Sequence, residues 1–69
     1  MDTVEYRKLK YEGIAAERYI YQVHKNTGVY YTYDRQEAKW YGPADSQWSS
    51  YCDASTEIMD ELEAKLICL

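Results

Sequence analysis

RYIYQVHKNTGVYYTYD, residues 18–34, is the stretch of sequence that decides the fold. Two runs of β-branched and aromatic residues, 18–24 and 29–34, flank the turn sequence Lys25-Asn-Thr-Gly28. Aromatic and β-branched side chains favour strands, and a glycine at the end of the turn can adopt the left-handed conformation that closes a bulged hairpin loop. The pattern therefore predicts a β-hairpin.

A three-residue turn sets the register that we expect in this hairpin, with Val23 opposite Tyr31. In that register one face is almost wholly apolar and should meet the core, because successive side chains of a strand point to opposite faces. The expected core face consists of Tyr19, Tyr21, Val23, Tyr31 and Tyr33. The expected solvated face consists of Arg18, Ile20, Gln22, His24, Tyr30, Thr32 and Asp34.

The segments around the hairpin extend it to a sheet over about residues 3–42. Residues 3–11 contain Thr, Val and Tyr in loose alternation, which favours a strand and leaves a helix open. Residues 38–41 are expected to form a short further strand that Gly42-Pro43 ends. A Ser-rich loop is expected over 43–52.

The last segment, about 53–67, has the strongest helical pattern. Asp53 or Ser55 can cap its start, and apolar residues recur at helical spacing. This apolar stripe consists of Ile58, Met59, Leu62, Leu66 and Leu69. It needs a partner, and the tyrosine face of the sheet can provide one. We therefore expect an α+β fold in a single domain over 1–69: a small antiparallel β-meander of three or four strands packed against one C-terminal amphipathic helix.

The composition points to binding surfaces rather than to catalysis. The chain of 69 residues has nine Tyr, two Trp and no Phe. Tyr and Trp combine a large apolar ring with a polar group and are enriched at binding hot spots. They are also suited to a half-buried core, so each tyrosine has two possible roles. Composition alone does not separate the tyrosines of the core from those of an interface.

Charge is unevenly distributed along the chain. Residues 1–43 carry seven Lys or Arg and six Asp or Glu, a sum of +1, whereas residues 44–69 carry one Lys and six Asp or Glu, a sum of −5. The whole chain has a net charge of −4. An acidic protein gains nothing from the phosphates of nucleic acid, and its field steers it toward a basic partner. We expect no direct nucleic-acid binding.

No sequence motif indicates catalysis, a cofactor or a metal. His24 is the only histidine, the three glycines are far apart, and Cys52 and Cys68 are sixteen positions apart without companion histidines. We therefore expect no enzyme, no cofactor and two reduced thiols in a cytoplasmic protein. The N-terminus lacks the features of a signal peptide, and no window approaches the run of about 20 apolar residues that a membrane span needs.

Two groups of side chains are candidates for binding a partner. Carboxylates on the polar side of the predicted helix could take the place of phosphates and speed encounter with a basic surface. This group consists of Asp53, Glu57, Asp60 and Glu61. Exposed aromatic side chains could act as desolvated anchors that slow release. This second group consists of Tyr30, Trp40, Tyr41 and Trp48. The simpler interpretations are a solvated helix face and ordinary core aromatics.

The stretches Val29–Tyr31 and Trp40–Pro43 resemble the second half of a WW domain, which has an aromatic pair in its middle strand and a Trp-x-x-Pro ending. The resemblance implies that Tyr31 and Trp40 form a groove that clamps a proline-rich ligand. The chain departs from the pattern because Tyr19 stands near the place of the first Trp and the second loop is short. The polar His expected in that loop is absent.

The whole chain is also similar, at the level of its class, to the small phage and mobile-element inhibitors of bacterial defence, anti-CRISPRs in particular. These are short, acidic, aromatic-rich single domains without cofactors, and the chain has the aspect of one complete small domain. The resemblance implies a non-enzymatic inhibitor that occupies a basic, nucleic-acid-binding surface of a larger protein, such as a CRISPR effector, in a bacterial cytoplasm. The alternatives are a WW-like module and a small structural homodimer. No motif is diagnostic of this group, so no residue role is carried over.

Overall fold

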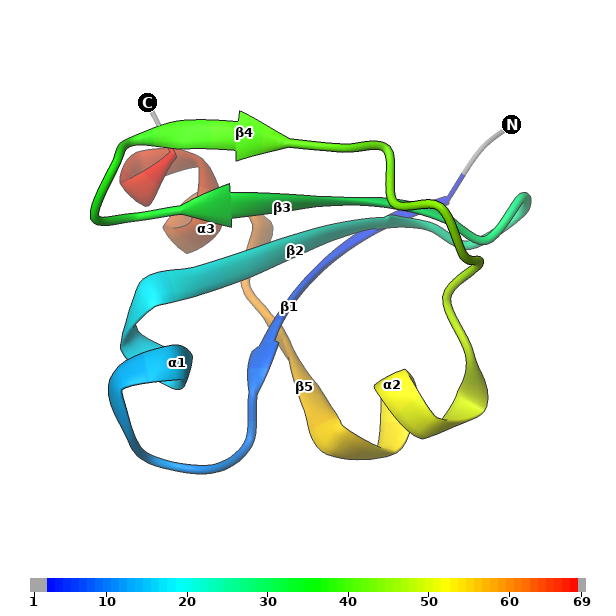
Figure 1. Cartoon of the computed structure of the whole chain (residues 1–69), viewed down its shortest axis with the longest axis horizontal. Helices are drawn as coiled ribbons and strands as arrows, with labels where there is room; N and C mark the ends of the chain where they lie inside the picture. The colour runs from blue at the N-terminus through cyan, green and yellow to red at the C-terminus, as the bar shows by residue number, and fades with distance from the viewer. Residues whose placement is uncertain (1–2, 69) are drawn as a thin grey trace.

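The computed structural model describes residues 3–68. It has an α+β fold that consists of one antiparallel sheet of five strands and three short helices (Figure 1). In chain order the elements are β1 (Val4–Leu9), α1 (Ile14–Arg18), β2 (Tyr19–His24), β3 (Val29–Asp34), β4 (Lys39–Tyr41), α2 (Ser50–Ser55), β5 (Thr56–Met59) and α3 (Glu61–Ile67). The strand order is β4-β3-β2-β1-β5. The expected meander with a C-terminal helix is therefore confirmed, and β5 adds a further strand on the far side of β1. Residues 4–9 form a strand, so the helical alternative for this segment is wrong.

The hairpin of β2 and β3 is confirmed, but its register differs by one residue from the predicted one. His24 pairs with Val29 and Gln22 with Tyr31, because the turn has four residues rather than three. The N–H of Gly28 donates to the His24 carbonyl at 2.8 Å, and Gly28 has a φ of 78°. A slip of one residue moves a strand's side chains to the other face.

The register decides which side chains form the core. Ile20, and not Tyr19 or Tyr21, lies on the same face as Tyr33. Five buried residues form the main hydrophobic cluster on that face, with Ile67 and Cys68 packed against it. They are Tyr6, Ile20, Tyr33, Met59 and Ala64. Since Ala64 belongs to α3, the C-terminal helix covers this face of the sheet.

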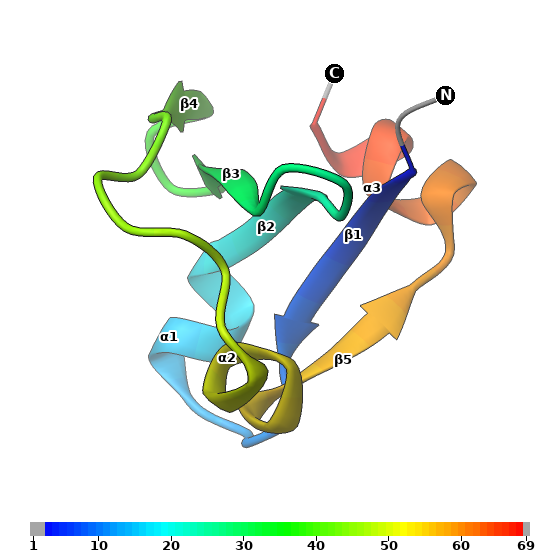
Figure 2. The same ribbon diagram turned by 90° about the vertical axis from the view of Figure 1, so that its right-hand side faces the viewer.

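The opposite face of the sheet is covered by α2 and by the loop that precedes it. Val23 is fully buried there, and Tyr21 and Tyr30 on the same face pack with Trp48 from the loop before α2. Arg7 extends from this face to the backbone carbonyl of Asp53 in α2 at 3.2 Å. Figure 2 shows α2 and α3 at the two ends of β5. The sheet thus carries a separate layer of side chains on each face.

The continuous helix predicted over 53–67 is wrong. α2 ends at Ser55, Thr56–Met59 pairs with β1, and α3 begins after Asp60, whose side chain accepts a hydrogen bond from the Leu62 N–H at 2.8 Å. The β-branched residues at 56 and 58 favour a strand, and an aspartate favours a cap over a helix interior. Pairing with β1 also buries Thr56 and Met59.

This break also divides the predicted apolar stripe. Met59 enters the core, whereas Ile58, Leu62 and Leu66 are more than three-fifths exposed, at 61, 68 and 67%. Leu69, the last member of the predicted stripe, lies outside the described residues. The sheet therefore extends beyond residue 42 to include β5, and the expected loop over 43–52 already contains the start of α2.

Candidate binding site

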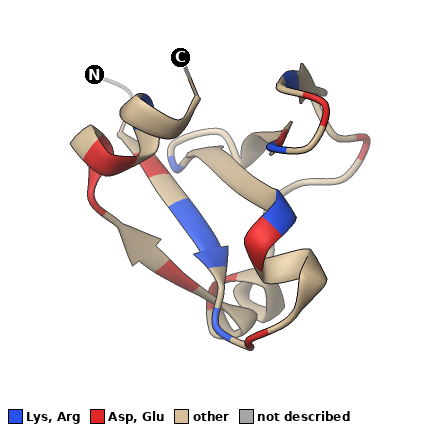
Figure 3. Cartoon of the chain, turned by 90° about the vertical axis from the view of Figure 1, so that its left-hand side faces the viewer, with Lys and Arg blue, Asp and Glu red and all other residues tan. Residues whose placement is uncertain are grey.

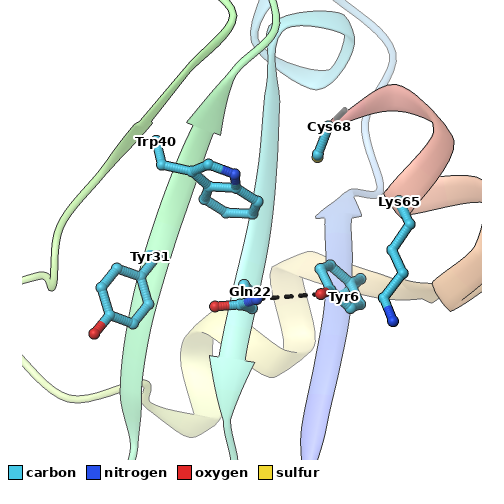
Figure 4. Close-up of a pocket in the computed structure, with 6 residues that line it drawn as sticks. All are labelled: Tyr6, Gln22, Tyr31, Trp40, Lys65 and Cys68. Atoms are coloured by element: carbon cyan, nitrogen blue, oxygen red, sulfur yellow. Dashed lines mark hydrogen bonds between the residues drawn. The ribbon is translucent and has the colours of Figure 1, made fainter.

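One pocket lies between the β2–β3–β4 part of the sheet and helix α3, with a volume of about 390 Å³. We call it the aromatic pocket; it is lined by Tyr6, Gln22, Tyr31, Trp40, Lys65 and Cys68. Figure 4 shows the side chains of Tyr31 and Trp40 projecting from neighbouring strands, with those of Lys65 on α3 and of Cys68, directly after it, across from them. The pocket therefore has an aromatic wall, a polar floor and a helical wall.

The aromatic wall follows from the register of β3 and β4. Trp40 pairs with Tyr33, so Trp40 and Tyr31 lie on the same face. The indole of Trp40 packs on Tyr33 with the ring centroids 5.1 Å apart, and the ring of Tyr31 packs edge-on against His24 at 5.8 Å. These contacts hold the two rings in place while leaving Trp40 36% exposed.

The polar atoms of these two rings have no hydrogen-bond partner within residues 3–68. Among the described residues, neither the indole N–H of Trp40 nor the hydroxyl of Tyr31 takes part in a hydrogen bond. The floor is different, because the amide of Gln22 donates to the Tyr6 hydroxyl at 3.1 Å. The aromatic wall therefore offers an indole N–H and a hydroxyl that no described residue engages.

The helical wall carries two titratable groups that are already stabilised. The Lys65 ammonium lies 2.9 Å from the Glu61 carboxylate, and this hydrogen bond raises the pKa of Lys65. Burial raises the pKa of the Cys68 thiol, so that it is protonated near neutral pH. Neither group has the character of an activated nucleophile or base.

The predicted anchors Tyr30 and Trp48 lie on the other face of the sheet, where they pack on each other. Their ring centroids are 5.0 Å apart, and Tyr21 lies 5.7 Å from Trp48. The indole N–H of Trp48 donates to the Asp53 carboxylate at 2.5 Å. Trp48 therefore holds α2 on the sheet, and its ring and N–H are used within the fold.

The structure does not bring the predicted carboxylates together on one helix face, so that part of the prediction is wrong. Asp53 lies in α2, where hydrogen bonds from Trp48 and then from Lys25 lower its pKa. Glu57 lies on β5, 3.9 Å from Lys8. Asp60 caps α3 and Glu61 pairs with Lys65. Figure 3 shows basic and acidic positions interspersed over the fold, with acidic positions at the start of α3.

The two predicted anchors on β4 point to opposite faces of the sheet. Trp40 lines the aromatic pocket, whereas Tyr41 lies on the other face, where its hydroxyl donates to Glu37 and its ring lies 5.2 Å from the Lys39 ammonium. Of the eight predicted partner-binding residues, Trp40 alone lines the pocket. Tyr31, named by the WW resemblance, joins it there.

Sequence reasoning missed the remaining four pocket residues, Tyr6, Gln22, Lys65 and Cys68. The predicted register places Gln22 on the solvated face. Lys65 and Cys68 reach the pocket because α3 is a separate short helix that starts after β5. The alternation of residues 3–11 was the one signal that could have placed Tyr6 beside Gln22, since these two residues are paired across β1 and β2.

Comparisons with known proteins give no relative: no family model, no curated protein and no solved structure matches this chain. Within residues 3–68, no three His, Cys, Asp or Glu side chains are grouped so that they could hold a metal ion. None of the helices described here has the length and apolar character needed to cross a membrane.

Proposed function

We propose that the protein is a non-enzymatic binding module whose aromatic pocket holds an extended, proline-containing peptide. The observation that carries the proposal is the pairing of Tyr31 and Trp40 on one pocket wall, each with a hydrogen-bond donor that no described residue uses. The ligand is an extended peptide that lies across the two rings. The resemblance of 29–31 and 40–43 to a WW domain supports the same ligand class.

Proline-rich segments suit such a wall for two physical reasons. They adopt the polyproline II conformation in advance, so binding orders them at little entropic cost, and their carbonyls have no internal hydrogen-bond partner. Trp40 and Tyr31 present flat apolar rings for proline and an N–H and an O–H for such carbonyls. A volume of about 390 Å³ suits a short stretch of side chains rather than a large cofactor.

The experiment is a calorimetric titration of the purified protein with proline-rich peptides, which measures the dissociation constant. The matched pair of variants is Trp40→Ala and Tyr41→Ala, which lie on adjacent residues of β4 and face opposite sides of the sheet. Loss of a buried aromatic anchor costs about 2 kcal/mol or more, which is a loss of about 30-fold in affinity. We expect that loss in Trp40→Ala and near-unchanged affinity in Tyr41→Ala.

Two outcomes would argue against the peptide-binding proposal. One is equal affinity for a peptide in which every proline is replaced by alanine, because the pocket would then not select polyproline II. The other is an equal loss of affinity in the two variants, since an effect of Tyr41→Ala could only come from general damage to β4.

A second candidate function is the inhibition of a basic, nucleic-acid-binding protein, in the manner of an anti-CRISPR in a bacterial cytoplasm. The observation that favours it is the acidic start of α3, where Asp60 and Glu63 are exposed and have no ion pair among the described residues. Glu57 and Glu61 lie in the same stretch of chain. Such a surface would steer the protein toward a basic patch.

This candidate predicts a partner that is captured from a bacterial lysate at low salt and lost at high salt. Asp60→Asn with Glu63→Gln should weaken capture of that partner, and asparagine keeps a capping side chain at residue 60. The control is Glu12→Gln with Glu17→Gln, which removes the same charge from an exposed region away from α3. If both double variants captured the partner equally well, the start of α3 would have no specific role in binding it.

A further inference from the structure

We propose that two copies of this chain associate through β5, so that the two five-stranded sheets join edge to edge. β5 is an outer strand of the sheet, paired with β1 on one side. An outer strand offers its free N–H and C=O groups to another strand. The inference goes beyond the peptide-binding proposal and does not depend on it.

The hydrogen-bonding pattern between β1 and β5 shows which backbone N–H and C=O groups of β5 point away from β1. The Lys10 N–H donates to the Ser55 carbonyl at 3.2 Å, and the register continues from there to Glu57 opposite Lys8 and Met59 opposite Tyr6. In an antiparallel pair, alternate residues exchange backbone bonds. The N–H and C=O of Ile58 therefore point away from β1, to the outside.

The neighbouring outward position is already occupied. The Thr56 N–H donates to the Asp53 carbonyl as the cap of α2, and the Thr56 carbonyl accepts from Arg7 at 3.3 Å. Ile58 is thus the residue of β5 at which a second strand can add.

Apolar side chains are exposed along the same run of chain. The Ile58 side chain is 61% exposed, and Leu62 and Leu66, one helical turn apart on α3, are 68% and 67% exposed. Figure 2 shows α3 beginning directly beyond the end of β5, on the same side of the molecule. Ile58 lies on the face of the sheet opposite α3, so these side chains do not form one patch; each is a large apolar residue exposed on the open strand or on the helix that follows it.

A second copy fits this edge because the strand is complementary to itself. With a two-fold axis through Ile58, each Ile58 faces the same residue of the second copy, Glu57 faces Met59, and Thr56 faces Asp60. No like charges lie opposite each other. A register centred on residue 57 would instead place two glutamates opposite each other, which is destabilising. Two-fold pairing is also the commonest symmetry of protein dimers.

The other outer strand is a poorer site for a second copy. β4 has three residues, and one of them is Lys39, whose charge disfavours edge pairing. Pairing through β5 also leaves the aromatic pocket open, because that pocket is lined by β2, β3, β4 and the second half of α3 beside Tyr6. A dimer would carry two such pockets.

The test is the mass of the protein in solution, measured by sedimentation equilibrium over a series of concentrations. We expect the mass to rise from 8.2 kDa toward twice that value. Ile58→Lys should raise the dimer dissociation constant by at least about tenfold, because the dimer loses an apolar contact and gains two charges at its axis. Ile14→Lys is the matched control, since Ile14 is 82% exposed and belongs to α1 rather than to β5 or α3.

A second variant protects the test against an effect on β5 itself. Leu62→Gln with Leu66→Gln changes α3 alone and should also weaken the dimer. Hydrogen exchange gives an independent check, because the Ile58 amide should be protected at high protein concentration and not at low concentration. The proposal is overturned if the wild type keeps a mass of 8.2 kDa at all concentrations, or if Ile58→Lys and Ile14→Lys associate alike.

Discussion

Met59 and Ile58 are adjacent residues of β5 with opposite environments, and truncating each to alanine tests the strand directly. Met59 is 7% exposed and belongs to the main core, whereas Ile58 is 61% exposed on the other face. In a continuous helix over 53–67, both residues would lie on the same apolar stripe and their truncation would cost similar amounts. A strand predicts that the costs differ strongly.

The expected difference follows from burial. Met59→Ala removes three heavy atoms from the core and leaves a cavity beside Tyr6 and Ala64, and such changes cost about 2–5 kcal/mol. Ile58→Ala removes atoms that are mostly in water, so we expect a change within about 0.5 kcal/mol. A domain of this length has a free energy of unfolding of roughly 3–10 kcal/mol, so loss of the Met59 side chain would remove a large share of it.

The assay is equilibrium unfolding in urea, followed by tryptophan fluorescence, at protein concentrations at which the wild type is monomeric. For a small domain the slope is about 1 kcal/mol per molar urea, so a loss of about 3 kcal/mol moves the midpoint by about 3 M. Equal shifts of the midpoint for the two variants would refute the assignment of residues 56–59 to a strand.

Three further predictions concern the parts of the fold outside β5. Arg18 hydrogen-bonds Asp34 and holds the pKa of that carboxyl below its usual value. The ion pair therefore stabilises the fold above about pH 4, and this stabilisation is lost as the pH falls through the lowered pKa of Asp34. Asp34→Asn should make the free energy of unfolding depend less on pH in this acidic range, as measured by unfolding curves at a series of pH values. Trp48→Phe should raise the pKa of the Asp53 carboxyl, measured by NMR titration, and cost about 1 kcal/mol, and an unchanged pKa would contradict the hydrogen bond. Gly28→Ala should cost about 1–2 kcal/mol in thermal unfolding because Gly28 has a φ of 78°, and a neutral effect would contradict that turn.

The local parts of the fold were predictable from the sequence, and the pairings between distant segments were not. The β2–β3 hairpin follows from residue types on both sides of one turn. Its register depends on whether that turn has three or four residues, and Gly28 at its end fits both. The length of the turn decides whether Tyr21 or Ile20 lies on the same face as Tyr33. A difference of one residue in the turn therefore changes which side chains of β2 enter the main core.

The C-terminal segment shows why local periodicity was insufficient. The spacing of Ile58, Met59, Leu62 and Leu66 fits a helix, and the local signals against it, the β-branched Thr56 and Ile58 and the capping residue Asp60, are weaker than that periodicity. The competing strand needs the open side of β1, whose Arg7 bonds to Thr56, a residue 49 positions away. Tertiary pairing of this kind overrides local propensity.

The candidate site was predictable to a similar extent. The pairing of Trp40 with Tyr31 is what the resemblance to a WW domain implies, through its aromatic pair and its Trp-x-x-Pro ending. The helical wall, with Lys65 and Cys68, was not predictable because it depends on where α3 begins. Asp53 was expected at an interface, but its carboxylate is engaged by Trp48 and Lys25, which the linear sequence does not place near it.

The indole N–H signals of the two tryptophans test the central claim most directly. In a nitrogen–proton correlation spectrum these two signals stand apart, and they report on opposite faces of the sheet. Titration with a proline-rich peptide should move the Trp40 signal as its N–H gains an acceptor, and leave the signal of Trp48, already bonded to Asp53, in place. A Trp40 signal that stays fixed at saturating peptide would contradict the account.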